Sequence, residues 1–250
     1  MHRIEVHKLI TSRWLLVYLS EKLSAITYIE HSFNAATQDS LPTNLLHLHQ
    51  QHSNTVVEAG SNDESGKIAA DAVFTRSSRP ISIITADCLP ILVSSTAEPF
   101  VAAIHAGWKG LSTGIIKNSF NAFSLAGVDK SSLKVALGPC IMECCYEVQL
   151  QMIRDIESIH GALWDGDQPP WFPSRPAHSV SSAIATHGEA WLSLSRYCIL
   201  LLMAEGINPS QIEESAICTY CSDLGFGSYR RRQHRSEQKT FQYSWIRSLL

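Results

Sequence analysis

Short apolar runs separated by turn-forming residues dominate the chain and predict β-strands. Residues 80–86 are rich in β-branched side chains, and residues 99–104 form a second near-continuous apolar run. Runs without polar alternation are typical of strands buried on both faces of a sheet that is covered by helices. Other apolar or extended segments predict further strands at residues 13–19, 26–33, 45–49, 55–58, 70–75, 89–94, 133–137, 214–219 and 242–246.

Apolar residues spaced three or four positions apart predict helices. The first begins near Ser112 or Thr113, which are both good N-cap residues. Helical spacing also covers residues 148–159 and 182–205, and Gly206 is a natural C-cap for the second of these. Because strands and helices are mixed without clean alternation, we expect an α+β (mixed α/β) fold. No shift in composition divides the chain, so we expect a single domain over residues 1–250.

The composition excludes several classes of function. Hydrophobic residues make up 45% of the chain and charged residues 17%, a balance typical of a globular domain. The formal net charge of −3 provides no general basic surface, so we expect neither nucleic acid nor membrane as a partner. No apolar run approaches the roughly 18–20 residues of a membrane span. Seven cysteines, an odd number in a long chain, fit reduced thiols in the cytoplasm better than a disulfide framework.

Three segments each carry a metal-capable side chain near the end of an extended run: His52, Cys88 after residues 81–86, and His105 after residues 100–104. Side chains at strand ends project into the crevice where sheets commonly bind ligands, so neighbouring strands would present these residues together. One thiolate and two imidazoles suit zinc and leave a fourth position open for water or substrate. Asp87 is a candidate partner for a ligand histidine, or a proton acceptor.

Spacing alone does not join these three residues, and other interpretations stay open. A histidine after a strand is more often a core or surface residue, and a cysteine in an apolar run is more often a small buried hydrophobe. A second candidate is a structural four-cysteine zinc site, because Cys218 and Cys221 have C-x-x-C spacing and a further cysteine cluster exists. That further cluster lacks C-x-x-C spacing and consists of Cys140, Cys144 and Cys145.

Residues 228–235 form the only basic run in the sequence. They are a candidate anion site, because arginine binds phosphate in a bidentate manner, and a solvated loop is the alternative. Residues 110–114 match the G-x-S-x-G pattern of a nucleophile elbow. A loop separates Ser112 from the preceding predicted strand, however, so a helix N-cap is the favoured interpretation of this serine.

These segments, in this order, resemble the YfiH-like family, also called the laccase-domain or purine nucleoside phosphorylase family. The most specific part of the resemblance is Thr-Ala-Asp-Cys-Leu-Pro at residues 85–90 followed by His-Ala-Gly-Trp-Lys-Gly at residues 105–110. The other matching segments are residues 50–53, 71–75, 138–141, 145–148, 218–219 and 228–231. The resemblance implies a four-layer α/β/β/α sandwich with mixed β-sheets, and a zinc ion bound by His52, Cys88 and His105.

The resemblance also implies an activity. The family is associated with phosphorolysis of adenosine, inosine, guanosine and S-methyl-5′-thioadenosine, and with adenosine deamination. On this basis we expect Cys88, His105 and Asp87 to take part in catalysis, with nucleosides and phosphate as partners and a monomer or weak dimer as the assembly. The residues expected to contact phosphate or nucleoside are Lys109, Tyr229, Arg230 and Arg231.

The sequence also departs from the family pattern. Many relatives have T-R-x-G-G where residues 31–37 read His-Ser-Phe-Asn-Ala-Ala-Thr, and T-G-R where residues 236–239 read Ser-Glu-Gln-Lys. If those arginines bind substrate, this chain differs in substrate preference or rate. Two other activities stay open: a cysteine-type hydrolase or amidase acting on cell-wall peptide precursors, and a copper-dependent polyphenol oxidase. One His2Cys site resembles a mononuclear copper site more than a multi-copper cluster, which favours zinc over copper.

Overall fold

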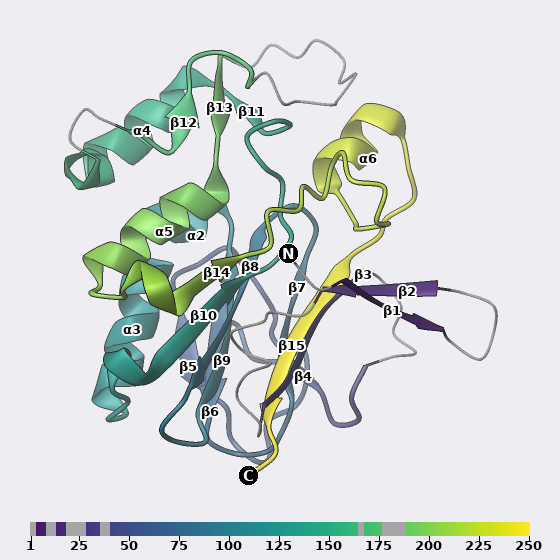
Figure 1. Ribbon diagram of the computed structural model, residues 1–250, viewed down its shortest axis with the longest axis vertical. Coiled ribbons are helices and arrows are strands. Elements are labelled where there is room, and N and C mark those ends of the chain that lie inside the picture. The colour runs from purple at the N-terminus through teal and green to yellow at the C-terminus, as the bar shows by residue number, and fades with distance from the viewer. Residues whose placement is uncertain (1–3, 9–13, 19–28, 36–40, 165–167, 177–188) are drawn as a thin grey trace.

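The computed structural model describes residues 4–8, 14–18, 29–35, 41–164, 168–176 and 189–250, and its core is a pair of six-stranded mixed sheets (Figure 1). The first sheet contains, in spatial order, β1 (Ile4–Lys8), β2 (Trp14–Tyr18), β3 (Ile29–Ala35), β15 (Gln242–Ser248), β7 (Ile81–Thr85) and β4 (Leu46–His47). The second contains β14 (Ile212–Glu214), β10 (Leu133–Leu137), β8 (Leu89–Ser95), β9 (Val101–Ala106), β6 (Ala72–Thr75) and β5 (Val56–Glu58).

The central strands of the second sheet are buried on both faces, as their continuous apolar sequences predict. Side chains alternate along a strand, so Ala102 and Ile104 of β9 belong to one core cluster, while Val101 and Ala103 belong to another. The second cluster also contains Ile83 of β7 and therefore lies between the two sheets. His105 follows Val101 and Ala103 in the same alternation, which directs its side chain toward the space between the sheets.

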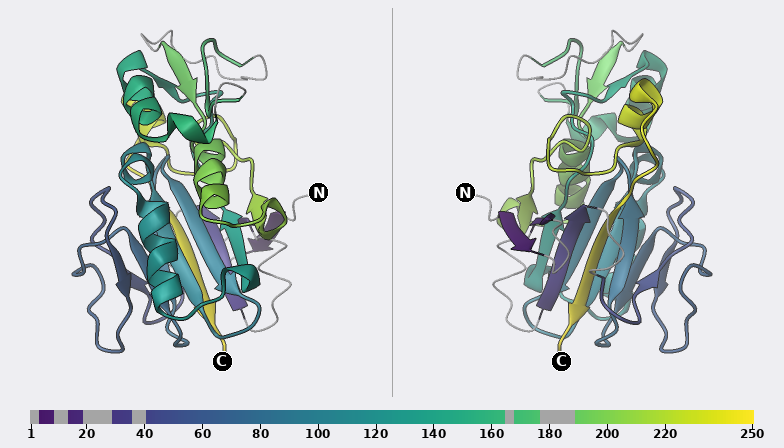
Figure 2. Two further views of the ribbon diagram at one scale, coloured as in Figure 1. Left: turned by 90° about the vertical axis from the view of Figure 1, so that its left-hand side faces the viewer. Right: turned by 90° about the vertical axis from the view of Figure 1, so that its right-hand side faces the viewer.

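Helices cover the outer face of the second sheet. The layer consists of α2 (Trp108–Ser112), α3 (Ile115–Leu125) and α5 (Leu194–Ala204), which lie in front of the strands in the left view of Figure 2. Phe120 and Phe123 of α3 and Tyr197 of α5 are buried in the same core cluster as the outward-facing residues of β9. These mixed sheets and the helices packed on them confirm the expected α+β fold.

A smaller unit lies at one end of the sheets, at the top of Figure 1. It combines α4 (Leu150–His160) with a three-stranded sheet, in the order β11 (Glu147–Val148), β13 (Ala190–Leu192) and β12 (Trp171–Phe172). The helix α6 (Tyr229–Arg235) lies at the same end. Short 3-10 helices complete the described elements: η2 (Lys130–Ser132), η3 (Gly161–Leu163) and η4 (Pro209–Gln211). Within the described ranges, no helix combines the length and the apolar character needed to cross a bilayer.

The structure corrects three expected elements. Residues 190–192 form β13 instead of the middle of a helix, and α5 begins only at Leu194.

Ser112 lies in the last turn of α2, where its hydroxyl donates to the carbonyl of Lys109, so it is neither a helix N-cap nor a nucleophile elbow. Gly114, with a left-handed backbone (φ 96°), precedes α3 instead. The strand expected at 214–219 lies earlier in the chain, since β14 spans Ile212–Glu214 and overlaps the prediction only at Glu214. Residues 9–13, 26–28, 36–40 and 177–188, which entered other expectations, lie outside the described residues.

Candidate active site

His52, Cys88 and His105 lie together at the end of the sheets that faces α4 and α6, and their ligand atoms all lie within 4.8 Å of one another. Cys88 belongs to the short link that crosses from β7 in the first sheet to β8 in the second. Because β8 pairs antiparallel with β9, with Pro90 opposite His105, the start of β8 and the end of β9 meet at one edge. The three residues predicted as metal ligands therefore lie close together in the structure.

The geometry of the three side chains fits a tetrahedral metal ion. The Cys88 Sγ and His52 Nε2 atoms are 3.6 Å apart, and the two imidazole rings are 4.7 Å apart between centroids in an edge-to-face arrangement. Zinc bonds of about 2.3 Å to sulfur and about 2.0–2.1 Å to nitrogen place two tetrahedral ligand atoms about 3.6 Å apart. Cys88 and His52 are therefore already at the separation that two ligands of one zinc ion require. One thiolate and two imidazoles could hold a metal ion such as zinc, and three protein ligands would leave one coordination position open.

Asp71 holds two of the three segments in place. This fully buried carboxylate accepts hydrogen bonds from the backbone amides of Gln51, His52 and Ser53, and from the Ser53 hydroxyl at 2.6 Å. Its Oδ1 atom also accepts the Nδ1 proton of His105 at 2.7 Å. Because a carboxylate only accepts, this bond fixes the proton on Nδ1 and leaves Nε2 free to face Cys88.

The loop that carries His52 is also attached to the first sheet. The side-chain amide of Gln50 donates to the carbonyl of Ile84 and accepts from its N–H, both at 2.8 Å, so it continues the sheet beside β7. His52 itself has a left-handed backbone (φ 56°), a conformation that non-glycine residues adopt only when their surroundings hold them there. The bonds to Asp71 and Ile84 supply that restraint, so the position of His52 is built into the fold.

The charges in this group favour a thiolate beside an imidazolium when no metal ion is bound. Burial opposes ionisation of Cys88, but the charge of His105 and hydrogen bonds from both histidines outweigh it and lower the thiol pKa to about 6. Burial likewise opposes protonation of His105, but the negative charges of Cys88 and Asp71 raise its pKa to about 9. Burial would raise the pKa of Asp71, yet its hydrogen bonds with His105 and Ser53 hold it well below the usual range. Cys88 is thus prepared to act as an anionic ligand near neutral pH.

A cavity of about 640 Å³ opens over the three residues. Its volume falls within the usual range for sites that bind small molecules, about 300–1,000 Å³. Aromatic and aliphatic side chains form most of the wall, and arginines of α6 contribute the positive charge. The lining includes Gln50, His52, Asp87, Cys88, His105, Trp108, Ile141, Tyr146, Met152, Leu194, Tyr229, Arg230, Arg232 and Phe241.

Asp87 lines the cavity, but Asp71 is the carboxylate that receives the hydrogen bond of a histidine in the triad. The Asp87 carboxylate accepts from the Thr219 hydroxyl at 2.7 Å and from the Arg230 amide at 2.6 Å, so it holds the start of α6. Burial raises the pKa of Asp87, and these hydrogen bonds oppose the rise. Asp87 adjoins Cys88 in the sequence and was therefore a candidate, whereas Asp71 was not predicted, although it begins one of the segments that match the family.

The expected substrate residues separate into two groups. Tyr229 and Arg230 line the cavity, whereas Lys109 is exposed on α2 and does not belong to the described cavity wall. Arg231 of α6 is directed at the segment that precedes this helix, where its guanidinium donates to the carbonyls of Thr219, Tyr220 and Phe226. Its role within the described residues is therefore to hold the segment before α6 rather than to reach the cavity.

Among the described residues, Arg230 and Arg232 are the arginines that line the cavity, and they differ in their partners. Arg230 forms an ion pair with the buried Glu147 at 2.5 Å and stacks over the ring of Tyr146. Arg232 belongs to the basic run predicted as an anion site but was not among the individual residues expected to contact substrate. It lies over the ring of Tyr229 and forms no ion pair among the described side chains. Arg232 is therefore the cationic group in this wall whose charge is available to an anionic ligand.

The backbone of Gly107 packs closely against the side chains of Cys88 and His52, and this contact leads to a first prediction. A Cβ atom at this position would lie 2.9 Å from the Cys88 Sγ atom and 3.2 Å from the His52 ring. Gly107→Ala is expected to displace both ligands and to weaken zinc binding about tenfold or more, because ligand shifts of this size disturb metal coordination. The measurement is a competition titration with a chromophoric chelator. Gly161→Ala is the matched control, since its Cβ would meet only the Glu157 Cβ at 3.8 Å; equal affinities for the two variants would contradict the prediction.

Residues 29–241 match the family model described as multi-copper polyphenol oxidoreductase laccase. The chain belongs to this family. Its members include the YfiH-like proteins, as the resemblance of the sequence predicted: the purine nucleoside phosphorylase YfiH of Shigella flexneri is 27% identical over 204 residues, which cover 81% of this chain and 74% of that protein.

Further relatives and solved structures agree with the family and the fold. A purine nucleoside phosphorylase of Pseudomonas aeruginosa is 32% identical over 187 residues, which cover 74% of this chain and 67% of that protein. Adenosine deaminase RL5, from an unknown prokaryotic organism, is 30% identical over 169 residues, 67% of this chain and 59% of that protein. The crystal structure of YlmD from Geobacillus stearothermophilus superposes with a TM-score of 0.77 at 18% identity, and covers 98% of this chain and 99% of that one. That likeness shows the shared fold of this laccase-domain chain.

Proposed function

We propose that this chain is a zinc-dependent purine nucleoside phosphorylase that acts on adenosine, inosine, guanosine and S-methyl-5′-thioadenosine and also deaminates adenosine. The observation that carries the proposal is the juxtaposition of a metal-competent His2Cys group with a cavity of about 640 Å³ that has aromatic walls and an arginine edge. Relatives named as purine nucleoside phosphorylases and as an adenosine deaminase support the same chemistry.

His52, Cys88 and His105 would hold the zinc ion, and the distance between Cys88 and His52 fits it. When bound, zinc would supply an open coordination position that polarises a bound oxygen or nitrogen atom and stabilises developing negative charge. Asp71 would keep the Nε2 atom of His105 directed at the metal through its bond to Nδ1.

The cavity walls suit a purine nucleoside. Flat aromatic rings offer stacking surfaces for a purine, and the described wall contains Trp108, Tyr146, Tyr229 and Phe241. Asp87 has a raised pKa and lies in the same wall, so we propose that it carries a proton to or from the purine. Arg232 would bind the phosphate that attacks the ribose, because a guanidinium without a carboxylate partner recognises phosphate oxygens in a bidentate manner.

The proposal is tested by assaying the zinc-loaded protein with inosine in the presence and absence of phosphate. We expect free base and ribose 1-phosphate only when phosphate is present, and inosine together with ammonia from adenosine. A chelator should remove both activities and added zinc should restore them. Absence of both base release and deamination with every one of the four nucleosides would overturn the proposal.

Arg232→Ala extends the same test to the phosphate site. We expect the KM for phosphate to rise about tenfold or more while the KM for inosine changes little, since loss of one charge-assisted pair costs about 1.5–3 kcal/mol. Arg235→Ala is the control, because Arg235 belongs to the same helix and packs over Tyr220 instead of lining the cavity. A larger effect on inosine than on phosphate would assign Arg232 to the nucleoside instead.

A cysteine-type hydrolase is the second candidate, favoured by the low pKa of Cys88 beside His105. The two candidates respond in opposite ways to metal. A hydrolase that uses Cys88 as its nucleophile would be inhibited by zinc and active after chelation, whereas the phosphorylase requires zinc.

A further inference from the structure

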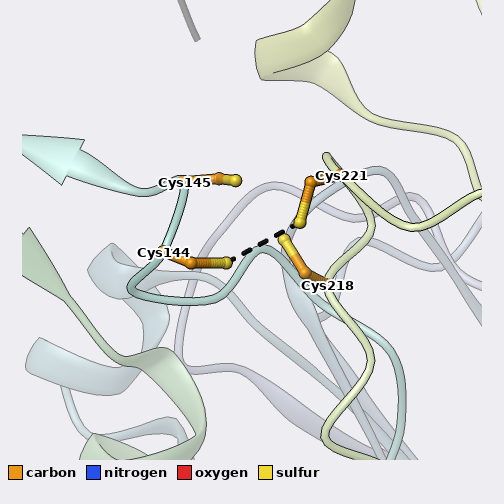
Figure 3. A group of neighbouring side chains, drawn as sticks. All are labelled: Cys144, Cys145, Cys218 and Cys221. Carbon is orange, nitrogen blue, oxygen red and sulfur yellow. Dashed lines mark hydrogen bonds between the residues drawn. The ribbon is translucent and has the colours of Figure 1, made fainter. Parts of the chain in front are cut away.

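Four cysteines outside the cavity converge on one point between two loops. The thiols of Cys144, Cys145, Cys218 and Cys221 all lie within 4.8 Å of one another, and Figure 3 shows their sulfur atoms directed toward a common centre. Cys144 and Cys145 come from the loop between β10 and β11, and Cys218 and Cys221 come from the segment between β14 and α6. The sequence analysis had considered a four-cysteine site, and the structure selects these four and leaves Cys140 out of the group.

Local backbone structure explains how the two pairs present their sulfur atoms together. Residues 143–145 form a turn in which the amides of Cys145 and Tyr146 both donate to the carbonyl of Met142, and this turn directs two consecutive cysteines to the same side. Cys218 and Cys221 flank another turn, closed by the bond from the Ser222 amide to the Cys218 carbonyl. The missing C-x-x-C spacing in the first pair is therefore no obstacle to a joint site.

The spacing of the sulfur atoms matches a metal centre. The Sγ atoms of Cys144 and Cys221 are 3.8 Å apart, and four thiolates around one zinc ion at about 2.3 Å lie about 3.8 Å from one another. A disulfide requires about 2.05 Å, so Cys144 and Cys221 are not bonded in this arrangement. These cysteines border the main hydrophobic core, and their sulfur atoms also contact one another around a shared centre. Cys144, Cys145 and Cys218 are buried and Cys221 is partly exposed, which suits a closed structural site with one side open for loading.

We propose that Cys144, Cys145, Cys218 and Cys221 bind a second, structural zinc ion as four thiolates. Zinc binding replaces the four thiol protons, which pass to solvent, and involves no change of oxidation state. The proposal stands on these four residues and does not depend on the proposed activity of the triad.

The two loops joined by this zinc ion also shape the cavity. Tyr146, next to Cys145, lines the cavity, and Thr219, between Cys218 and Cys221, donates to Asp87 beside Cys88. The second loop continues into α6, which carries Tyr229, Arg230 and Arg232. The metal would thus hold both loops that contribute to the cavity wall. A backbone β-bridge between Cys140 and Cys218 already joins the same two loops.

The test is the zinc content of purified reduced protein, measured by plasma mass spectrometry on a set of variants. We expect two zinc ions per wild-type chain, one in Cys88→Ala, one in Cys221→Ser and none in the variant that combines both changes. Cys221→Ser is chosen because this side chain is partly exposed and tolerates a hydroxyl. Cys140→Ser is the matched control, since Cys140 is buried beside Cys218 but outside the group, and it should retain two ions.

Cobalt substitution in the Cys88→Ala background identifies the ligands independently. The remaining cobalt ion should show the intense sulfur-to-metal charge-transfer absorption of four thiolates, and adding Cys221→Ser should abolish this absorption together with the bound metal. Circular dichroism shows whether each variant is folded, and Cys144→Ser replaces Cys221→Ser if the latter is not. Two outcomes would overturn the proposal. The first is that Cys88→Ala binds no zinc. The second is that Cys221→Ser and Cys144→Ser are both folded and both keep two zinc ions per chain. If Cys88→Ala retains one zinc ion but the wild-type protein processes no nucleoside, the proposed function is refuted and the four-cysteine zinc site is not.

Discussion

Asp71→Asn is expected to weaken zinc binding at the triad about 10–100-fold and to lower the free energy of unfolding by about 3–5 kcal/mol. The Asp71 carboxylate is fully buried and is surrounded by donors from residues 51–53 and from His105. An asparagine would turn an NH2 group toward some of these donors and would remove the negative charge that faces His105. The histidine would then lose its fixed proton position, and His52 would lose the support of its strained backbone.

Chelator competition measures the affinity in this experiment, and urea denaturation measures the stability. Asp155→Asn is the matched control, because Asp155 is an exposed residue of α4 whose carboxylate accepts only from the Gln151 side chain among the described residues. The control should leave both quantities unchanged within about 0.5 kcal/mol. If Asp71→Asn bound zinc as tightly as the control does, Asp71 would have a purely structural role.

Cys88→Ala is expected to remove zinc from the triad and to lower nucleoside phosphorolysis about a thousandfold, because metal assistance contributes several kcal/mol of transition-state stabilisation. Metal-free wild-type protein gives a second readout. With its pKa lowered to about 6, Cys88 is mostly thiolate at pH 7, so iodoacetamide should alkylate it with a rate that rises through pH 6 and then levels off.

Zinc should protect Cys88 from this alkylation, since a coordinated sulfur is not a free nucleophile. Cys140→Ala serves as the control for substitution of a buried cysteine near the site, and it should retain zinc at the triad and most of the activity. Mass spectrometry of tryptic peptides locates the alkylated residue. Rapid alkylation of Cys88 in zinc-loaded protein, with activity that a chelator does not reduce, would favour the cysteine hydrolase instead.

Local sequence pattern predicted the strands best where both faces are covered. The run before Cys88 and the run before His105 became β7 and β9, in different sheets, and the link from β7 to β8 brings Cys88 beside the end of β9. The pattern failed at residues 190–192, where Ala-Trp-Leu has apolar residues that fit a helix as well as a strand. Only pairing with β11 and β12, which are distant in sequence, decides between the two.

The directions of neighbouring side chains at the site were also beyond the reach of the local pattern. Asp87 is next to Cys88 in the sequence, but its left-handed backbone (φ 87°) and its partners Thr219 and Arg230 direct it toward α6. Arg231 and Arg232 are likewise neighbours, yet one is held by loop carbonyls and the other lines the cavity. Sequence can name the residue types that a site requires, but the direction of each side chain depends on contacts with segments far away along the chain.

The position of β15 has a consequence for how the protein is made. This strand, Gln242–Ser248, lies between β3 and β7, and Phe241 just before it contributes to the cavity wall. The first sheet therefore has a gap at its centre until residues 242–248 have left the ribosome. During synthesis, β7 would expose a hydrogen-bonding edge beside the Cys88 link, and such edges promote association between chains. A completed cavity is therefore expected only after residues 241–248 have emerged and β15 has paired with β3 and β7.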